Sequence, residues 1–100
     1  MRILEGTLTF EWDKGNKDKN FLKHRVTNQE AEEIFFDPSK KILKNDCYEA
    51  EERYLLIGMT KKERLLFIVF TLRGEKIRVI SARDLNKKER FLYEEQDESS

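Results

Sequence analysis

The chain of 100 residues has little of several residue types, and each shortage excludes a class of protein. The chain has one cysteine, Cys47, which permits neither an internal disulfide nor a multi-cysteine zinc site. The chain also has only one histidine, so a structural zinc site built from cysteine and histidine together is not expected. The four glycines form no phosphate-binding loop. No apolar run approaches the roughly 20 residues that cross a bilayer, and no signal-peptide pattern opens the chain. We therefore expect a cytoplasmic protein with no membrane contact and no cofactor.

The formal net charge is +0, but the charges are unevenly distributed. Residues 60–93 carry ten basic and four acidic side chains, a net charge of +6, whereas residues 94–100 carry four acidic side chains and no basic one. A basic half attracts phosphates even in a neutral molecule, although lysine-rich turns produce the same asymmetry without any function. The length suits one core, so we expect a single domain over residues 1–94 and an acidic tail over residues 95–100.

The N-terminal half predicts one strand and two helices. Residues 7–12 alternate apolar and polar side chains, which is typical of a strand. Residues 16–24 read as a short helix. A second helix begins near Thr27, which has the capping-box spacing to Glu30, and it stops before Asp37-Pro38 because proline disfavours helical geometry in the residue before it.

The C-terminal half predicts a sheet and a last helix. Residues 39–50 are expected to form a polar loop, and Asn86 with Glu89 predicts a capped final helix. Three strands with short turns are expected between them, at residues 53–58, 65–70 and 76–83. The order gives an α+β domain with an antiparallel sheet: one N-terminal strand, two helices, a three-strand meander and a C-terminal helix.

Asn20, Lys23 and His24 have spacings that place them on one face of the first helix. His24 is suited to proton transfer near neutral pH, and Lys23 to holding a phosphate. The alternative is that Lys23 is simply solvated and His24 ends the helix against its dipole.

Arginines form a second candidate set, because their planar fork of donors matches phosphate oxygens. Alternation places Arg78 and Arg83 on opposite faces of their strand, so a straight strand cannot aim both into one groove. Arg83, at the strand end, has a salt bridge to Asp84 or Glu89 as its alternative role. The set comprises Arg64, Arg73, Arg78 and Arg83.

Glu89, Arg90 and Tyr93 are neighbours on the last helix. A carboxylate and a phenol are suited to proton transfer. Alternatively, Tyr93 packs with Phe91 and Leu92 against the sheet.

Read in order, these segments resemble the BrnT family over about residues 8–94. The resemblance rests on Phe10-Glu11-Trp12-Asp13, Asn20, Lys23-His24, Phe36-Asp37-Pro38, Glu52-Arg53-Tyr54, Ile57-Gly58, the run from Arg78 to Arg83, Glu89-Arg90 and Tyr93. One departure is Arg25, which stands where the family has a glycine after the Lys-His pair. A side chain makes a left-handed helix end costlier there. Met1 to Gly6 and the acidic tail lie outside the resemblance.

The resemblance implies a RelE-like fold and cleavage of RNA without a metal. It also implies neutralisation by a BrnA-type ribbon-helix-helix antitoxin, a heterotetramer with that antitoxin, and contact with operator DNA only through it. In the mechanism we expect, the 2′-hydroxyl of the substrate attacks the adjacent phosphate. Arg64 and Arg83 would stabilise charge, Lys23 would hold the backbone, and His24, Glu89 or Tyr93 would move protons. Two alternatives remain: a degenerate toxin that only binds an antitoxin or nucleic acid, and a stand-alone DNA-binding regulator.

Overall fold

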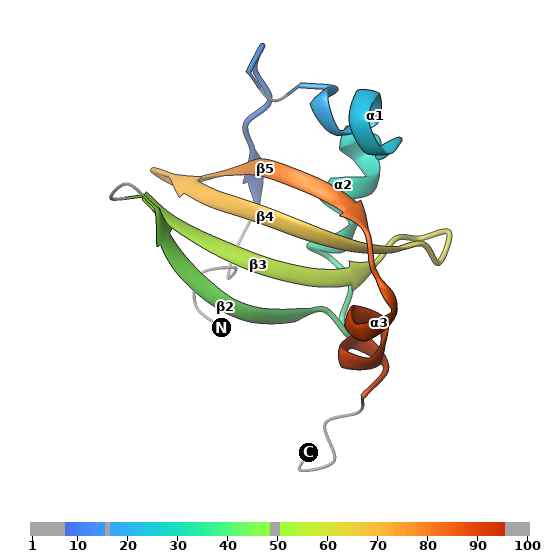
Figure 1. Ribbon diagram of the computed structural model, residues 1–100. Coiled ribbons are helices and arrows are strands. Elements are labelled where there is room, and N and C mark those ends of the chain that lie inside the picture. The colour runs from blue at the N-terminus through green and yellow to red at the C-terminus, as the bar shows by residue number, and fades with distance from the viewer. Residues whose placement is uncertain (1–7, 16, 49–50, 96–100) are drawn as a thin grey trace.

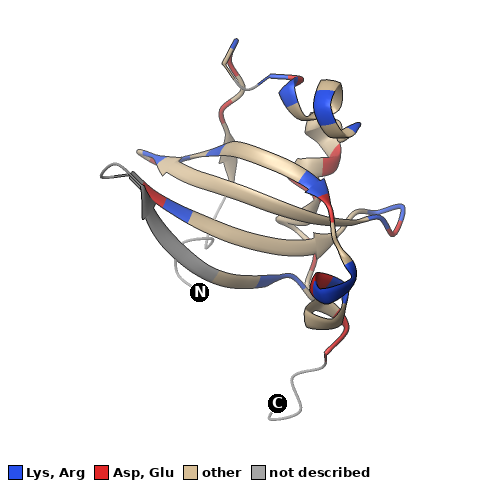
Figure 2. Ribbon diagram, in the orientation of Figure 1, with Lys and Arg blue, Asp and Glu red and all other residues tan. Residues whose placement is uncertain are grey.

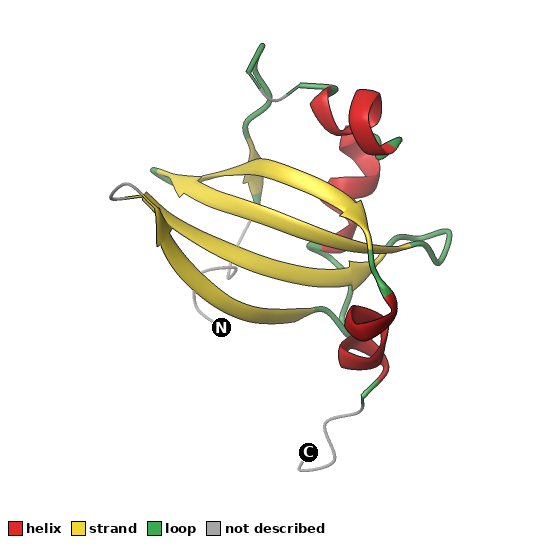
Figure 3. Ribbon diagram, viewed as in Figure 1, coloured by secondary structure: helices red, strands yellow, loops and turns green. Residues whose placement is uncertain are grey.

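The computed structural model describes residues 8–15, 17–48 and 51–95, which form a five-stranded sheet and three short helices (Figures 1 and 3). Met1 to Gly6 and all of the predicted tail except Glu95 lie outside these residues. The strands run across the sheet in the order β1 (Thr9–Phe10), β5 (Lys76–Asp84), β4 (Leu65–Arg73), β3 (Glu51–Met59) and β2 (Lys41–Tyr48). The predicted α+β class and the C-terminal meander are confirmed, and the meander is longer than expected.

The predicted polar loop at residues 39–50 was wrong, because most of it is β2. This strand pairs antiparallel with β3, from Lys41 opposite Ile57 to Tyr48 opposite Glu51. It occupies the edge of the sheet, where one side of the backbone stays in solvent and polar residues are tolerated. The hydrogen bonds to β3 stabilise the extended conformation of this segment, which its own residues do not favour. For this reason the sequence pattern alone predicts a loop.

The N-terminal strand also differs from the expected purely antiparallel sheet. β1 is only two residues long and pairs parallel with β5, with Thr9 opposite Lys76 and Phe10 opposite Ile77. Since more than sixty residues separate these strands, no turn of the chain fixes their relative direction. The pairing is instead set by packing, in which the Phe10 ring meets the edge of the Phe35 ring at 5.1 Å.

The three helices are α1 (Lys19–His24), α2 (Asn28–Ile34) and α3 (Lys87–Glu94). Both predicted capping boxes are present, Thr27 with Glu30 at α2 and Asn86 with Glu89 at α3. Each box satisfies two amide groups that would otherwise lack partners in the first turn. As predicted, α2 ends before Asp37-Pro38.

The core lies mainly between α2 and one face of the sheet. Ala31, Ile34 and Phe35 are buried there, and the Phe35 ring meets that of Phe70 edge to face at 5.0 Å. A smaller cluster lies on the opposite face, where Tyr93 of α3 packs against buried Ile57 and its neighbours. In Figure 1, α2 accordingly lies behind the sheet and α3 at the end where β3 and β5 finish.

A β-bulge in β5 changes which arginines share a face. Phe70 pairs with Val79 and Val69 with Ser81, so Ile80 is the extra residue. Arg78 lies opposite Thr71 and Arg83 opposite Phe67, two positions on the same face of β4. The alternation-based prediction that Arg78 and Arg83 face opposite ways was therefore wrong.

Candidate functional site

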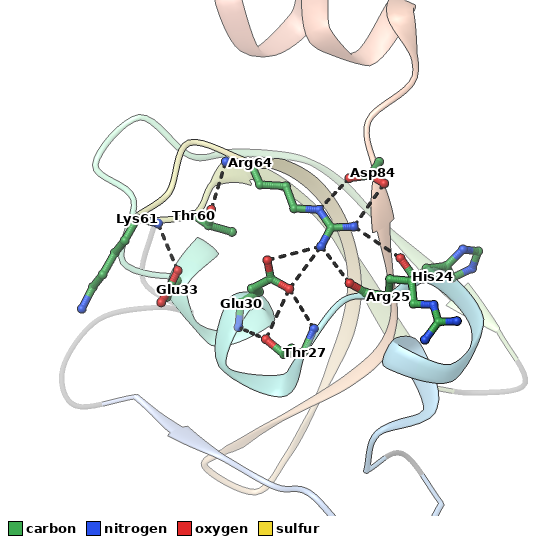
Figure 4. A network of polar contacts seen from close by, with 9 residues as sticks. All are labelled: His24, Arg25, Thr27, Glu30, Glu33, Thr60, Lys61, Arg64 and Asp84. Carbon is green, nitrogen blue, oxygen red and sulfur yellow. Dashed lines mark hydrogen bonds and ion pairs between the residues drawn. The ribbon is translucent and has the colours of Figure 1, made fainter.

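Arg64 lies at the centre of a polar network that joins four segments of the chain (Figure 4). Its Nε and one terminal nitrogen donate to both oxygens of Asp84 at 2.8 and 3.2 Å. The other terminal nitrogen donates to the backbone oxygen of Arg25 at 2.8 Å and to the Glu30 carboxylate at 3.1 Å. A last bond reaches the backbone oxygen of His24 at 3.3 Å. All five N–H groups of the guanidinium thus have protein acceptors.

The turn between β3 and β4 holds Arg64 in this position. The amide of Thr60 donates to the backbone oxygen of Arg64 at 2.8 Å, and the amide of Arg64 donates to the Thr60 hydroxyl at 3.0 Å. Thr60 is buried, and Glu63 accepts a positive φ of 68° to close the turn. The Lys61 amide donates to Glu33 at 3.0 Å, which fastens the turn to α2.

Arg83 and Glu89 form a two-pronged ion pair between the end of β5 and α3. Both terminal nitrogens of Arg83 donate to the two oxygens of Glu89 at 2.9 Å. The guanidinium also lies over the Phe67 ring, 4.2 Å from its centre, and about a third of the side chain is exposed. The salt-bridge alternative for Arg83 is therefore present, and Glu89 serves both as its partner and in the helix cap.

The paired carboxylates of Glu30, Asp84 and Glu89 are all more acidic than usual. Hydrogen bonding to Arg64 lowers the pKa of Asp84, and hydrogen bonding to Arg83 lowers that of Glu89, in each case against the opposing effect of burial. Burial is the largest influence on Glu30 and raises its pKa, but hydrogen bonds from Thr27 and Arg64 together outweigh it, so the pKa is lowered. All three groups are therefore ionised at neutral pH.

The C-terminal end of α1 carries His24 and Lys23. His24 contributes its backbone oxygen to the Arg64 network, and its ring lies on the outer side of that network in Figure 4. Lys23 is exposed, and within the described residues no hydrogen bond or ion pair involves its ammonium group. Asn20 does not share their surroundings, because it is buried and its Oδ1 accepts the Ala82 amide at 2.9 Å. Asn20 thus fixes α1 to β5.

Arg25 adopts the conformation that a glycine would provide at the end of α1. Its φ of 59° and ψ of 35° lie in the left-handed region, and its amide donates to the Phe21 backbone oxygen at 3.0 Å. Its guanidinium lies 5.5 Å from the centre of the Phe21 ring. A left-handed residue with a side chain costs about 1 kcal/mol, which the bond from Arg64 to the Arg25 oxygen offsets.

Tyr93 contacts neither Glu89 nor an arginine through its hydroxyl group. The hydroxyl donates to Asp37 Oδ2 at 2.7 Å, and this oxygen also accepts the Met59 amide at 2.7 Å. Burial, followed by the bond to Asp37 and its charge, raises the pKa of Tyr93 to about 12. The alternative in which Tyr93 packs with Phe91 and Leu92 was wrong for these two neighbours, because both are exposed.

The structure thus gathers most of the predicted residues at the end of the sheet where β5 finishes. They form two groups, the Arg64 network in Figure 4 and the Arg83–Glu89 pair, joined by a hydrogen bond from Arg83 to the Asp84 backbone oxygen at 3.1 Å. We call the two groups together the β5-terminal site: His24, Glu30, Arg64, Asp84, Arg83 and Glu89. Lys23 lies next to His24 in the sequence and adjoins the site. Tyr93 lies apart from it, where its hydroxyl group bonds to Asp37. Arg73 and Arg78 lie toward the opposite end of the sheet. Sequence reasoning missed Glu30 as a partner of Arg64, because 34 positions separate them and nothing local signals the pairing.

Within the described residues, no three His, Cys, Asp or Glu side chains are grouped to hold a metal ion. Across the same part of the chain, no helix has the length and apolar character needed to span a bilayer.

The fold has a match among solved structures. The solved structure of the Brucella abortus ribonuclease toxin, BrnT, matches with a TM-score of 0.59 and 23% sequence identity, covering 81% of this chain and 100% of that chain. A family model described as the ribonuclease toxin, BrnT, of type II toxin–antitoxin systems matches residues 12–89. The chain therefore belongs to the BrnT family of ribonuclease toxins. A search of curated proteins found no match.

Proposed function

We propose that this toxin cleaves RNA without a metal ion, using the 2′-hydroxyl group of the substrate as nucleophile. The 2′-oxygen bonds to the neighbouring phosphorus and the bond to the 5′-oxygen breaks, leaving a 2′,3′-cyclic phosphate and a free 5′-hydroxyl. Such a reaction requires positioning, charge stabilisation and proton transfer, all of which side chains supply.

His24 is the best candidate for proton transfer among the three residues that the sequence left open. Glu89 is held ionised by Arg83, and both its oxygens are occupied. The pKa of Tyr93 is raised to about 12 and its proton is committed to Asp37. Imidazole is the side chain suited to exchanging protons near neutral pH. In this proposal His24 accepts the 2′-hydroxyl proton and returns a proton to the departing oxygen.

The phosphate charge is assigned to Arg83 and Lys23. Arg83 is partly exposed, and Lys23 has a solvent-facing ammonium group beside His24. Arg64 is assigned a positioning role, because its donors are occupied by the end of α1, α2 and β5. The observation that carries the proposal is this tie, which brings the end of α1 to Asp84, the residue that follows Arg83 at the end of β5 and whose backbone oxygen accepts a bond from Arg83.

A cleavage assay tests the proposal directly. Purified toxin is incubated with single-stranded RNA in excess EDTA, and product ends are identified by mass. We expect cleavage with 2′,3′-cyclic phosphate ends, no cleavage of the 2′-O-methyl oligonucleotide, and loss of more than 100-fold in rate for His24→Gln, as removal of a general base typically gives. Lys62→Gln, an exposed change elsewhere, serves as the control. Dependence on added metal, or full activity of His24→Gln, would refute the mechanism.

We further propose that a BrnA-type ribbon-helix-helix antitoxin neutralises the toxin, in a heterotetramer that contacts operator DNA through the antitoxin. The basis is family membership, since toxins of type II systems act with a protein antitoxin. Co-expression with such an antitoxin should restore growth and yield a complex with two copies of each chain. Separate elution of the two proteins would contradict this partner.

One observation favours a second candidate, a degenerate toxin that binds its antitoxin but cleaves nothing. The guanidinium groups of both Arg64 and Arg83 are occupied by carboxylates, which leaves little free positive charge for a phosphate. This alternative would be favoured over the ribonuclease if the protein bound its antitoxin but did not cleave RNA, and if the Arg25→Gly variant also failed to cleave RNA.

A further inference from the structure

A second group of basic residues lies at the other end of the sheet from the β5-terminal site. Figure 2 shows blue segments near the start of β3, the end of β4 and the first half of β5, and on α1 above them. These residues border a surface pocket of about 150 Å³, well above the roughly 10–15 Å³ that one water molecule needs. Its lining includes Lys19, Arg53, Arg73, Arg78, Thr71 and Gly15. We call it the sheet-face pocket.

The sheet-face pocket is built from several elements rather than from one loop. Arg78 lies opposite Thr71 in the ladder between β5 and β4, and the Thr71 hydroxyl donates to the Glu52 backbone oxygen of β3 at 2.7 Å. Lys19 crosses from α1, its ammonium group 3.5 Å from the Ile80 backbone oxygen at the bulge. Cations from a helix and three strands therefore converge on one depression, and no described acidic residue lines it.

Arg78 forms one wall of this pocket and is held by two carboxylates. Its guanidinium donates to Asp13 at 2.6 Å and lies 3.5 Å from Glu11, and only 14% of its side chain is exposed. Gly15 allows this approach, because a Cβ there would lie 2.9 Å from an Arg78 nitrogen. The loop carrying Asp13 and Gly15 thus fixes one side of the pocket before any ligand arrives. Beside this fixed wall, the exposed side chains of Lys19 and Arg73 supply the kind of donors that favour phosphate oxygens.

The bulge at Ile80 places this pocket on the same face of β5 as Arg83. Arg83 lies five positions beyond Arg78, which corresponds to about 15 Å along a strand. This separation exceeds the length of a single phosphodiester group. An RNA that contacts both Arg78 and Arg83 must therefore be a chain of several nucleotides. Proteins that bind single strands without sequence preference commonly contact successive backbone phosphates through positively charged side chains.

We propose that the sheet-face pocket is a binding site for a backbone phosphate of the RNA substrate, remote from the scissile bond. The proposal rests on the ribonuclease function proposed above, since it assigns the pocket to the same substrate. It makes the toxin's affinity depend on RNA length. The pocket contributes to substrate binding, while bond cleavage takes place at the β5-terminal site.

The test compares two doubly substituted proteins with the wild type. Lys19→Gln/Arg73→Gln removes two exposed charges from the pocket, and Lys61→Gln/Lys62→Gln removes two exposed charges from the turn between β3 and β4. Unfolding temperatures establish that both fold. Binding of a fluorescent 2′-O-methyl RNA of about 12 nucleotides is measured by anisotropy across salt concentrations. Because this ligand resists cleavage, binding is read independently of the reaction.

We expect the pocket variant to bind the long RNA about tenfold more weakly at 0.1 M salt, with the salt slope reduced by about 0.7 for the one phosphate contact that is lost. With cleavable RNA, KM should rise for the long substrate with kcat unchanged, and neither should change for a dinucleotide. Equal weakening by the control variant would overturn the proposal, because binding would then reflect diffuse charge. Unchanged RNA affinity with lost neutralisation by antitoxin would also overturn it and assign the pocket to a protein partner. Absence of cleavage by the wild type would instead refute the ribonuclease proposal.

Discussion

Replacing Arg64 by methionine should destabilise the fold as well as the site. Methionine keeps most of the side-chain volume but removes all five donors. The change leaves the Glu30 and Asp84 carboxylates facing each other without their cation, and it frees the backbone oxygens of His24 and Arg25. The helix α1 then depends on the hydrogen bonds that Asn20 and Lys19 make to β5.

The size of the effect follows from how exposed these partners are. Removing one member of a fully buried pair costs about 3–5 kcal/mol. Arg64 and Glu30 side chains are each 27% exposed, and that of Asp84 is 60% exposed, so water compensates a good part of the loss. We expect about 2–3 kcal/mol, which lowers the unfolding temperature of a domain this size by about 10–15 °C.

Thermal unfolding followed by circular dichroism measures this directly, with Lys62→Met as the control that should stay within about 0.5 kcal/mol of the wild type. Asp84→Asn and the double variant complete a cycle, and we expect the two losses to be markedly less than additive. An Arg64→Met protein that unfolds within 2–3 °C of the wild type but has lost RNA cleavage would refute the reasoning. Arg64 would then act on the substrate rather than on the fold.

Three further predictions follow from local geometry and charge. Gly58→Ala should cost about 2 kcal/mol in urea unfolding, because its Cβ would lie 2.6 Å from Ile34 Cγ2. The paired carboxylates have lowered pKa values, so the unfolded chain binds more protons in acid. The stability they contribute is full above about pH 5 and should be lost as pH falls below it. Tyr93, with its pKa raised from 10.0 to about 12, stabilises the fold fully below pH 10 and loses this effect between pH 10 and about 12.

Each of these has a contrary result that is easy to recognise. An unchanged urea midpoint for Gly58→Ala would mean that α2 shifts away from β3 without cost. A flat stability profile between pH 3 and 6 would show that the carboxylates gain nothing from their arginines. For Tyr93, an alkaline absorbance titration that is unaltered in Tyr93→Phe near pH 12 would contradict the assigned pKa.

Local chemistry in the sequence determined where α2 and α3 begin and which segments form the main strands, whereas α1 begins at Lys19 rather than near residue 16 as expected. Thr27 with Glu30 and Asn86 with Glu89 predicted both capped helices, because a capping box is decided by residues three positions apart. Alternating or continuous apolar runs likewise predicted β3, β4 and β5, since one or both faces of these strands are buried. The resemblance of ordered motifs predicted the family.

Only the tertiary structure decided the rest, because it depends on contacts between distant segments. β2 is a strand by its pairing with β3 and not by its own pattern, and the bulge at Ile80 moves Arg78 onto the face of Arg83. The number of charges in the sequence could not show that the Arg64 guanidinium forms ion pairs with Glu30 and Asp84, which come from two other elements. Hydrogen-bond geometry is fixed by the packed backbone, so which arginine ties the fold and which remains partly open was settled by folding alone.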